Sequence, residues 1–230
     1  MVNPLISIVI PAHQEEGYIL ETIKSIHGQS YLEHETIVVA DSCTDRTAEI
    51  AREHGARVIE IESRNIAANR NIGARAAHGE IIVFLDADVI ISKDYLSQAA
   101  DAYLSGYDLG RPYYYYNHKN WIVKNMLIGM NLLKMRYYPH TFFISRRKFL
   151  QSGGFLERYA VCMEDLEFSD RVSKGARFKM LRSKAMNSTR RFSHNGTIKE
   201  LLHQTEGAMK YILFYRLLKK EIPFDYPILR

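Results

Sequence analysis

The sequence predicts an α/β domain with a mostly parallel central sheet and helices on both faces. Short, continuous apolar runs are separated by segments of about ten residues whose apolar side chains recur at helical spacing. Glycine and proline stand at the ends of many of these segments. Strands that alternate with helices in this way form parallel sheets covered on both faces. In the first half of the chain, strands are expected at Leu5–Ile10, Thr36–Ala40, Arg57–Ile61 and Ile81–Leu85.

The helices between these strands are indicated by their spacing and their ends. After the first strand, which Pro11 ends, Ile19, Leu20, Ile23 and Ile26 lie on one helical face. The next two helices are expected at Asp45–His54, closed by Gly55, and at Ile66–His78, closed by Gly79.

After Asp108 the alternation becomes irregular, but no linker, repeat or low-complexity segment interrupts the chain. Residues 1–230 are therefore expected to form a single domain. The four tyrosines of Tyr113–Tyr116 suit the face of a strand, although tyrosine also stacks on sugar rings. The remaining expected elements are strands at Thr141–Ser145 and Arg177–Leu181 and helices at Trp121–Met135, Glu164–Lys174 and Ile198–Lys219.

Composition favours a cytoplasmic protein that does not cross a bilayer. Cys43 and Cys162 cannot form a disulfide framework and lack the spacing of metal ligands. The apolar run Leu5–Ile10 is too short for a secretory segment, and no stretch approaches the ~20 apolar residues of a spanning helix.

Charge is distributed unevenly along the chain. Residues 1–108 carry 8 Lys/Arg and 17 Asp/Glu, whereas residues 109–230 carry 23 and 9. Two stretches without any acid, 109–156 and 171–199, hold 17 of the 31 cations. The basic second half is therefore expected to face an anionic partner, the alternative being that its cations are solvated and scattered around the fold.

The clearest chemical signal is Asp86-Ala-Asp88, directly after the strand Ile81–Leu85. Two carboxylates at one strand end can hold a hard cation, Mn²⁺ or Mg²⁺, together with substrate phosphate oxygens. One of them can also hold a ribose hydroxyl. Aspartate is common at helix starts as well, so this pair alone also fits a capped surface loop.

Two further strands deliver polar groups to the same edge, because ligands of parallel sheets bind at the carboxyl ends of the strands. Asp41 follows the second strand and can accept the ring N–H of uracil or guanine, although it could instead cap the next helix. Pro11, His13 and Glu15 follow the first strand. Three strand ends with acid or amide groups are more than helix capping requires.

The order of these motifs resembles that of the family 2 glycosyltransferases with the GT-A fold. The landmarks cover most of residues 5–175 and are, in order, Pro11–Glu15, Val38–Thr47, Arg70–Gly73 (R-N-x-G), Ile81–Asp88, Gly153–Phe155 and Glu164-Asp165. The chain departs from the family pattern at His13-Gln14, where the family usually has asparagine before the glutamate. It also departs at Ala40, where many members have a second aspartate.

The resemblance implies a Rossmann-like half, residues 1–108, that binds the nucleotide sugar, and an acceptor-binding half, residues 109–230. It implies that Asp165 is the catalytic base and that Glu164 orients the acceptor, although two acids also favour a helix N-terminus through its dipole. The residues then expected to bind the donor are Pro11, His13, Glu15, Asp41, Arg70 and Asp86.

The segment Arg190-Arg191-Phe192-Ser193-His194 supplies the remaining candidates. Arg190 and Arg191 are predicted to bind the diphosphate of the donor through forked hydrogen bonds. His194 is predicted to complete the coordination of a cation held by Asp86 and Asp88. The alternatives are solvated arginines and a surface histidine.

Together these features predict a metal-dependent, inverting glycosyltransferase that uses a UDP- or GDP-sugar. The basic half favours an anionic acceptor, such as a polyprenyl phosphate or an acidic saccharide, or peripheral binding to the inner face of a membrane. A sugar-phosphate nucleotidylyltransferase would need a Gly-rich basic loop after the first strand, and a dinucleotide-binding oxidoreductase would need G-x-G-x-x-G there. The chain has Pro11-Ala12-His13 at this place, which is neither motif. A non-catalytic module that binds membranes or nucleic acid would explain the charge but leave the acidic motifs without a purpose, so no nucleic-acid partner is expected.

Overall fold

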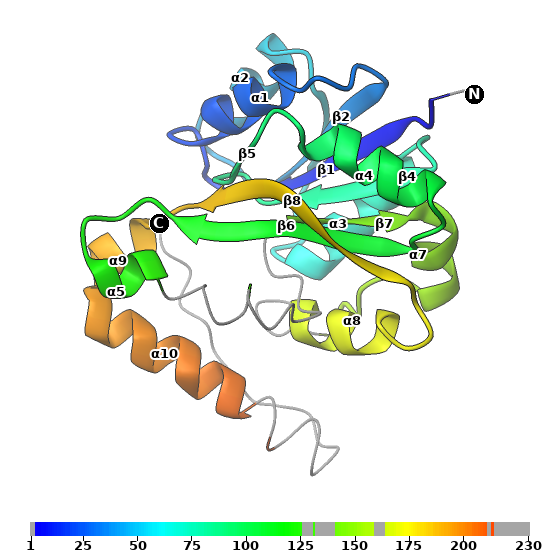
Figure 1. Ribbon diagram of the computed structural model, residues 1–230. Coiled ribbons are helices and arrows are strands. Elements are labelled where there is room, and N and C mark those ends of the chain that lie inside the picture. Colours follow the sequence, from blue (N-terminus) through cyan, green and yellow to red (C-terminus); the bar gives the residue numbers. More distant parts are fainter. Residues whose placement is uncertain (1–2, 126–130, 132–140, 159–163, 211–212, 214–230) are drawn as a thin grey trace.

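The computed structural model describes residues 3–125, 131, 141–158, 164–210 and 213 (Figure 1). Among these residues, eight strands form one sheet in the order β3-β2-β1-β4-β7-β6-β8-β5. The strands are β1 (Ile6–Ala12), β2 (His34–Asp41), β3 (Arg57–Ile61), β4 (Ile81–Leu85), β5 (Ile90–Ile91), β6 (Leu109–Tyr116), β7 (Thr141–Ser145) and β8 (Phe178–Asn187).

The first four strands make a parallel block, and β7 joins it antiparallel to β4. Strand β6 pairs antiparallel with β7 and parallel with β8. The short strand β5 pairs antiparallel with the end of β8, with Ile90 opposite Met186. The predicted α/β class with a mostly parallel sheet is confirmed.

Helices cover both faces of the sheet (Figure 1). One core packs α1 (Ile19–His27), α2 (Thr47–Glu53) and α4 (Tyr95–Leu104) against the sheet, and the other packs α3 (Ile66–Ala76), α7 (Arg146–Ser152) and α8 (Glu164–Val172) against the opposite face. The helices α5 (Trp121–Asn125), α9 (Arg190–Asn195) and α10 (Thr197–Lys210) lie together beyond the end of β6 (Figure 1).

Most expected elements are present, with shifted ends. Arg57–Ile61 and Ile81–Leu85 match their strands residue for residue. The strand expected at Arg177–Leu181 instead runs from Phe178 to Asn187. Tyr113–Tyr116 does belong to a strand, β6. The predicted helices Trp121–Met135 and Ile198–Lys219 are present as α5 and α10, and most of their later residues lie outside the described ones.

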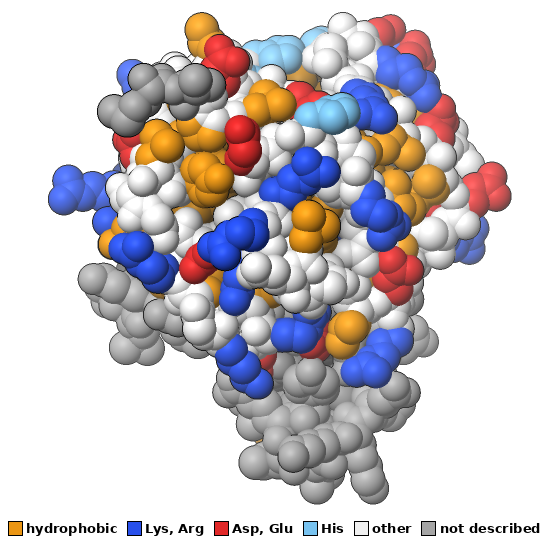
Figure 2. All heavy atoms as spheres, turned by 90° about the vertical axis from the view of Figure 1, so that its right-hand side faces the viewer, with side chains coloured by type: hydrophobic (Ala, Val, Ile, Leu, Met, Phe, Trp, Pro, Cys, Tyr) orange, Lys and Arg blue, Asp and Glu red, His pale blue; other side chains and the backbone are white. Residues whose placement is uncertain are grey.

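The described part of the chain contains no helix that is both long enough and apolar enough to cross a bilayer. On the face shown in Figure 2, cationic side chains lie among acidic and apolar ones and do not merge into one basic patch. That residues 1–230 form a single domain remains a prediction.

Close packing of α3 on the sheet fixes the position of the polar side chains that this helix carries. A Cβ atom added at Gly73 would overlap with Cγ1 of Val9 in β1 and would lie 3.2 Å from Cγ2 of Val39 in β2. Glycine therefore lets the helix approach both strands. The same helix then carries Arg70 and Asn71 to the carboxyl end of the sheet.

Candidate active site

The predicted polar motifs meet at one edge of the sheet. Because β2, β1 and β4 are adjacent and parallel, the residues after their carboxyl ends lie side by side. Helix α1 holds the backbone between the two aspartates that follow β4, because the hydroxyl of Thr22 donates to the carbonyl of Ala87 at 2.7 Å. The D-x-D segment is thus held in a defined position.

Arg70 joins two of the predicted acidic motifs. Its Nη2 lies 3.0 Å from Oδ1 of Asp86, and its Nη1 lies 2.5 Å from Oε1 of Glu164 at the start of α8. The arginine is 3% exposed, so its bond to Glu164 is shielded from water, whereas Asp86 stays partly exposed. Its guanidinium carbon also lies 5.3 Å from the centre of the Phe155 ring. The first acidic motif and the Glu164-Asp165 pair are therefore linked through one buried cation.

The charges of this cluster depend on burial and on neighbouring groups. Burial raises the pKa of Glu164 to about 7, and the negative charge of Asp165 adds to this effect, while Arg70 opposes it. Burial alone would lower the pKa of Arg70, but the carboxylates of Asp86 and Glu164 raise it. The guanidinium therefore stays charged, and Asp165, which is half-buried, is the more accessible acid of the pair.

Arg190 of α9 joins a second set of predicted residues. Its Nη1 and Nη2 each donate to one carboxylate oxygen of Glu15 at 2.6 Å, and its Nε lies 3.1 Å from Oδ2 of Asp88. The guanidinium carbon lies 5.0 Å from the centre of the Tyr18 ring. Arg190 thus connects the segment after β8 to both the loop after β1 and the D-x-D segment.

Asp41 is 2% exposed and is engaged by the chain itself. Burial would raise its pKa, but hydrogen bonds led by the one from Arg64 lower it to about 2, so this carboxylate is ionised at neutral pH. It orders the loop between β3 and α3. Its donors are the backbone N–H groups of Ser63, Arg64 and Asn65 and the side chains of Ser42, Ser63 and Asn69. Its predicted contact with a nucleotide base remains a prediction.

His13 and Pro11 lie next to this region. Pro11 is buried at the end of β1, and Nδ1 of His13 donates to the backbone carbonyl of Asp41 at 2.6 Å. The imidazole therefore ties the loop after β1 to the end of β2. Their predicted contacts with the donor, like that of Asp41, remain predictions.

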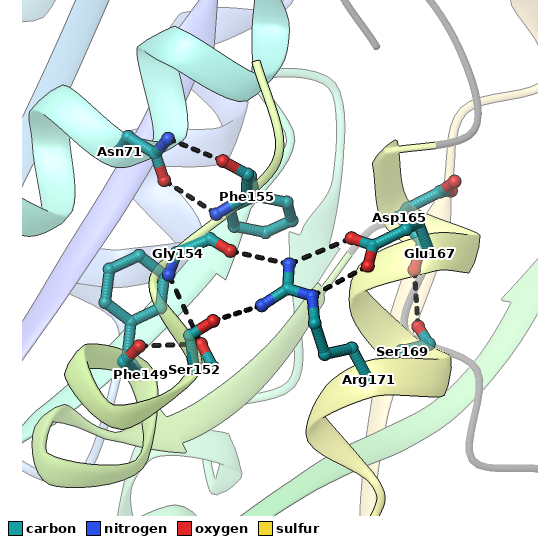
Figure 3. A network of polar contacts seen from close by, with 9 residues as sticks. All are labelled: Asn71, Phe149, Ser152, Gly154, Phe155, Asp165, Glu167, Ser169 and Arg171. Carbon is teal, nitrogen blue, oxygen red and sulfur yellow. Dashed lines mark hydrogen bonds and ion pairs between the residues drawn. The ribbon is translucent and has the colours of Figure 1, made fainter. Parts of the chain in front are cut away.

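A network that the sequence reasoning missed fixes α8 against the Gly-Gly-Phe turn (Figure 3). Arg171 pairs with Glu167 through both its Nε and its Nη2, at 2.7 and 2.8 Å, and it donates to the backbone carbonyls of Ser152 and Gly154. The only signal in the sequence is the i, i+4 spacing of Glu167 and Arg171, which is common on helix surfaces.

Asn71 holds the other side of the same turn (Figure 3). Its side chain accepts from the N–H of Phe155 at 2.8 Å and donates to the carbonyl of Phe155 at 2.9 Å. The Phe155 ring in turn stacks on Phe168 of α8, with ring centres 4.0 Å apart. The Arg70-Asn71 dipeptide of α3 therefore contacts both Glu164 and the turn on which α8 rests.

The two aspartates suit a hard divalent cation by their chemistry. Each gives one oxygen to an arginine, and their side chains remain 22% and 16% exposed for Asp86 and Asp88. His194 is exposed on α9, and within the described residues no three His, Cys, Asp or Glu side chains gather closely enough to hold a metal ion. Arg191 is half-buried beside Arg190, and the predicted roles of His194 and Arg191 remain predictions.

Comparisons with known proteins agree with this arrangement. Residues 7–166 match the family described as glycosyl transferase family 2. The chain is 34% identical over 103 residues to the putative glycosyltransferase EpsH of Bacillus subtilis, a match that covers 43% of this chain and 30% of EpsH. The chain thus spans about a third of that relative's length.

Two solved structures share the fold. TarS of Staphylococcus aureus in complex with UDP superposes with a TM-score of 0.68 at 21% identity, over 92% of this chain and 73% of that chain. A mannosyltransferase of Pyrobaculum calidifontis in complex with GDP-Man and Mn²⁺ superposes with a TM-score of 0.70 at 19% identity, over 97% and 67%. The family match covers more than half of the residues, and the ordered motifs meet at one edge of this sheet. The chain therefore belongs to glycosyltransferase family 2 and has the GT-A fold.

Proposed function

We propose that the chain transfers a sugar, with inversion, from a UDP- or GDP-sugar to an acceptor hydroxyl or phosphate. The observation that carries this proposal is the position of Asp86-x-Asp88 at the end of β4, joined through Arg70 to Glu164-Asp165 on α8. A donor site and an acceptor site need such proximity, because the reacting atoms must approach to ~3–3.5 Å. Structural neighbours that bind UDP-GlcNAc, UDP or GDP-Man support this class of donor.

In this proposal Asp88 and Asp86 would hold a divalent cation, Mn²⁺ or Mg²⁺, next to the donor diphosphate. When bound, the ion supplies Lewis-acid stabilisation of the leaving group. Arg190 and Arg191 bind the same diphosphate through charged hydrogen bonds. Pro11, His13, Asp41 and the ordered loop around it form the wall of the nucleotide site.

The chemical step needs one base and one displacement. Asp165 takes the proton of the acceptor hydroxyl as its oxygen forms a bond to the anomeric carbon of the sugar. The bond from that carbon to the diphosphate oxygen breaks, and the nucleoside diphosphate leaves. Glu164, held by Arg70, orients the acceptor. A single displacement inverts the configuration at the anomeric carbon.

On the acceptor side we propose an anionic partner or an anionic membrane surface. Trp121 of α5 is 72% exposed and Ile198 of α10 is 76% exposed. The lysines next to them, Lys119, Lys124 and Lys199, are exposed as well. Apolar side chains surrounded by lysines are typical of helices that lie in the interface of a bilayer with anionic lipids.

Removing the principal carboxylate of the cation site should abolish cation-dependent donor binding. Asp88→Ala is expected to eliminate the gain in UDP or GDP affinity that Mn²⁺ gives the wild type, as measured by calorimetry. Asp101→Ala, which removes an exposed acid of α4, serves as the control for a lost negative charge. Unchanged nucleotide affinity in Mn²⁺ for a folded Asp88→Ala protein would exclude the D-x-D segment as the cation site.

Removing the proposed base should separate chemistry from binding. Asp165→Asn keeps the shape of the side chain but removes its basicity, so donor affinity should survive while transfer slows by ~10²–10⁴. Release of nucleoside diphosphate and calorimetry measure the two effects. Asp170→Asn, the same change on the same helix, should leave both close to wild type. A rate for Asp165→Asn within threefold of wild type would mean that Asp165 is not the base: either another group takes the proton, or the acceptor is already ionised, as a phosphate would be.

Binding to vesicles tests the membrane surface. Sedimentation with equimolar phosphatidylcholine and phosphatidylglycerol should retain the protein at low salt and release much of it at high salt, since each Lys or Arg near such a surface contributes about 1 kcal/mol. The double variant Trp121→Ser/Ile198→Ser should bind these vesicles more weakly. The control variant Leu32→Ser, which changes another exposed apolar residue, should bind as the wild type does. Equal and negligible binding to neutral and anionic vesicles would exclude the membrane and leave a soluble acidic acceptor.

A further inference from the structure

Arg190 occupies the surroundings of the carboxylate to which the divalent cation is assigned. Its Nε lies 3.1 Å from Oδ2 of Asp88, and its two Nη atoms bind both oxygens of Glu15 at 2.6 Å. The side chains of Arg190, Glu15 and Asp88 are only 27%, 11% and 16% exposed. One guanidinium therefore neutralises two partly buried acids, and solvent screens this cluster less than a surface ion pair.

A divalent cation on Asp88 would be close to this guanidinium. Metal–oxygen distances of about 2.0–2.1 Å for Mg²⁺ place the ion within a few ångströms of Nε, on the same carboxylate. Like charges at such a separation repel strongly in a partly buried site. The cation and the present position of Arg190 therefore disfavour each other.

A nucleoside diphosphate would reverse this balance. Its phosphate oxygens carry negative charge and accept the forked hydrogen bonds that a guanidinium offers. Arg190 could then exchange its carboxylate partners for phosphate oxygens, which would free Asp88 for the cation. Both ligands would gain from the same movement of one side chain.

We propose that Arg190 is an internal counter-ion that holds Asp88 while no donor is bound and moves to the donor's diphosphate when the divalent cation enters. This inference rests on the proposed function and adds an order to it: cation and nucleotide bind with positive cooperativity, and the cation alone binds weakly. Thermodynamic reciprocity requires that each ligand strengthen the other by the same factor.

The test measures binding without any turnover. Mn²⁺ is titrated into the wild type, Arg190→Gln and Arg182→Gln, with the bound ion followed by electron paramagnetic resonance and no nucleotide present. Arg182 is exposed on β8, so its substitution controls for the loss of one positive charge. Arg190→Gln should bind Mn²⁺ more tightly than both other proteins, by on the order of 5- to 150-fold, the usual range of coupling between two sites.

The same proteins are then titrated with UDP and with GDP, with and without Mn²⁺. In the wild type each nucleotide that binds should tighten Mn²⁺ binding. In Arg190→Gln this gain should be clearly smaller, because only the direct attraction between the cation and the diphosphate remains. Arg190→Lys keeps the positive charge but not the forked hydrogen bonds of the guanidinium. Its Mn²⁺ affinity should lie between those of the wild type and Arg190→Gln, which preserves the test if Arg190→Gln does not fold.

Two outcomes would overturn the inference: Mn²⁺ affinity in Arg190→Gln no higher than in Arg182→Gln, or wild-type Mn²⁺ affinity that does not change with nucleotide. If the wild type binds neither UDP nor GDP in Mn²⁺, the proposed function fails as well. If it binds a nucleotide but Arg190→Gln leaves Mn²⁺ affinity unchanged, only the role of Arg190 as a counter-ion is wrong.

Discussion

The arrangement of the site depends on the buried guanidinium of Arg70. It bonds to Asp86 after β4 and to Glu164 on α8, a residue 94 positions away in the sequence. Without it, two acidic motifs would face each other in a region of low dielectric, where like charges repel strongly. The helix that carries Arg70 can reach this place because Gly73 lets it pack closely on β1 and β2. One helix thus sets the spacing between the D-x-D segment and the Glu164-Asp165 pair.

The fold could be predicted because its strands are short, buried and bounded by turn-forming residues. Ile81–Leu85 is entirely buried, and a continuous apolar run is what a strand covered on both faces requires. Strand β8 was predicted too short because one of its faces is open to solvent. Beyond Leu181 its exposed positions are Arg182 and Lys184, which break the apolar run but not the strand.

The sequence could place acids at the sheet edge, because a residue that follows a parallel strand must lie there. It could not show which arginine each acid pairs with, because Arg70 is 94 residues from Glu164 and Arg190 is 175 residues from Glu15, and such distant pairs leave no periodic signal in the chain. The role of Asp41 shows the same difficulty. The sequence suggests a contact with a nucleotide base, which remains a prediction, but it gives no sign that the two oxygens of Asp41 accept hydrogen bonds that order the loop before α3.

A double-mutant cycle on the free energy of unfolding tests most directly whether Arg70 is coupled to Glu164. Arg70→Met leaves Glu164 buried without its cation and should destabilise the protein by about 3–5 kcal/mol in urea denaturation. Adding Glu164→Gln removes the uncompensated charge. The double variant should therefore be more stable than the sum of the single effects predicts, by roughly 0.5–3 kcal/mol. Single effects that add without any coupling would contradict the role assigned to Arg70.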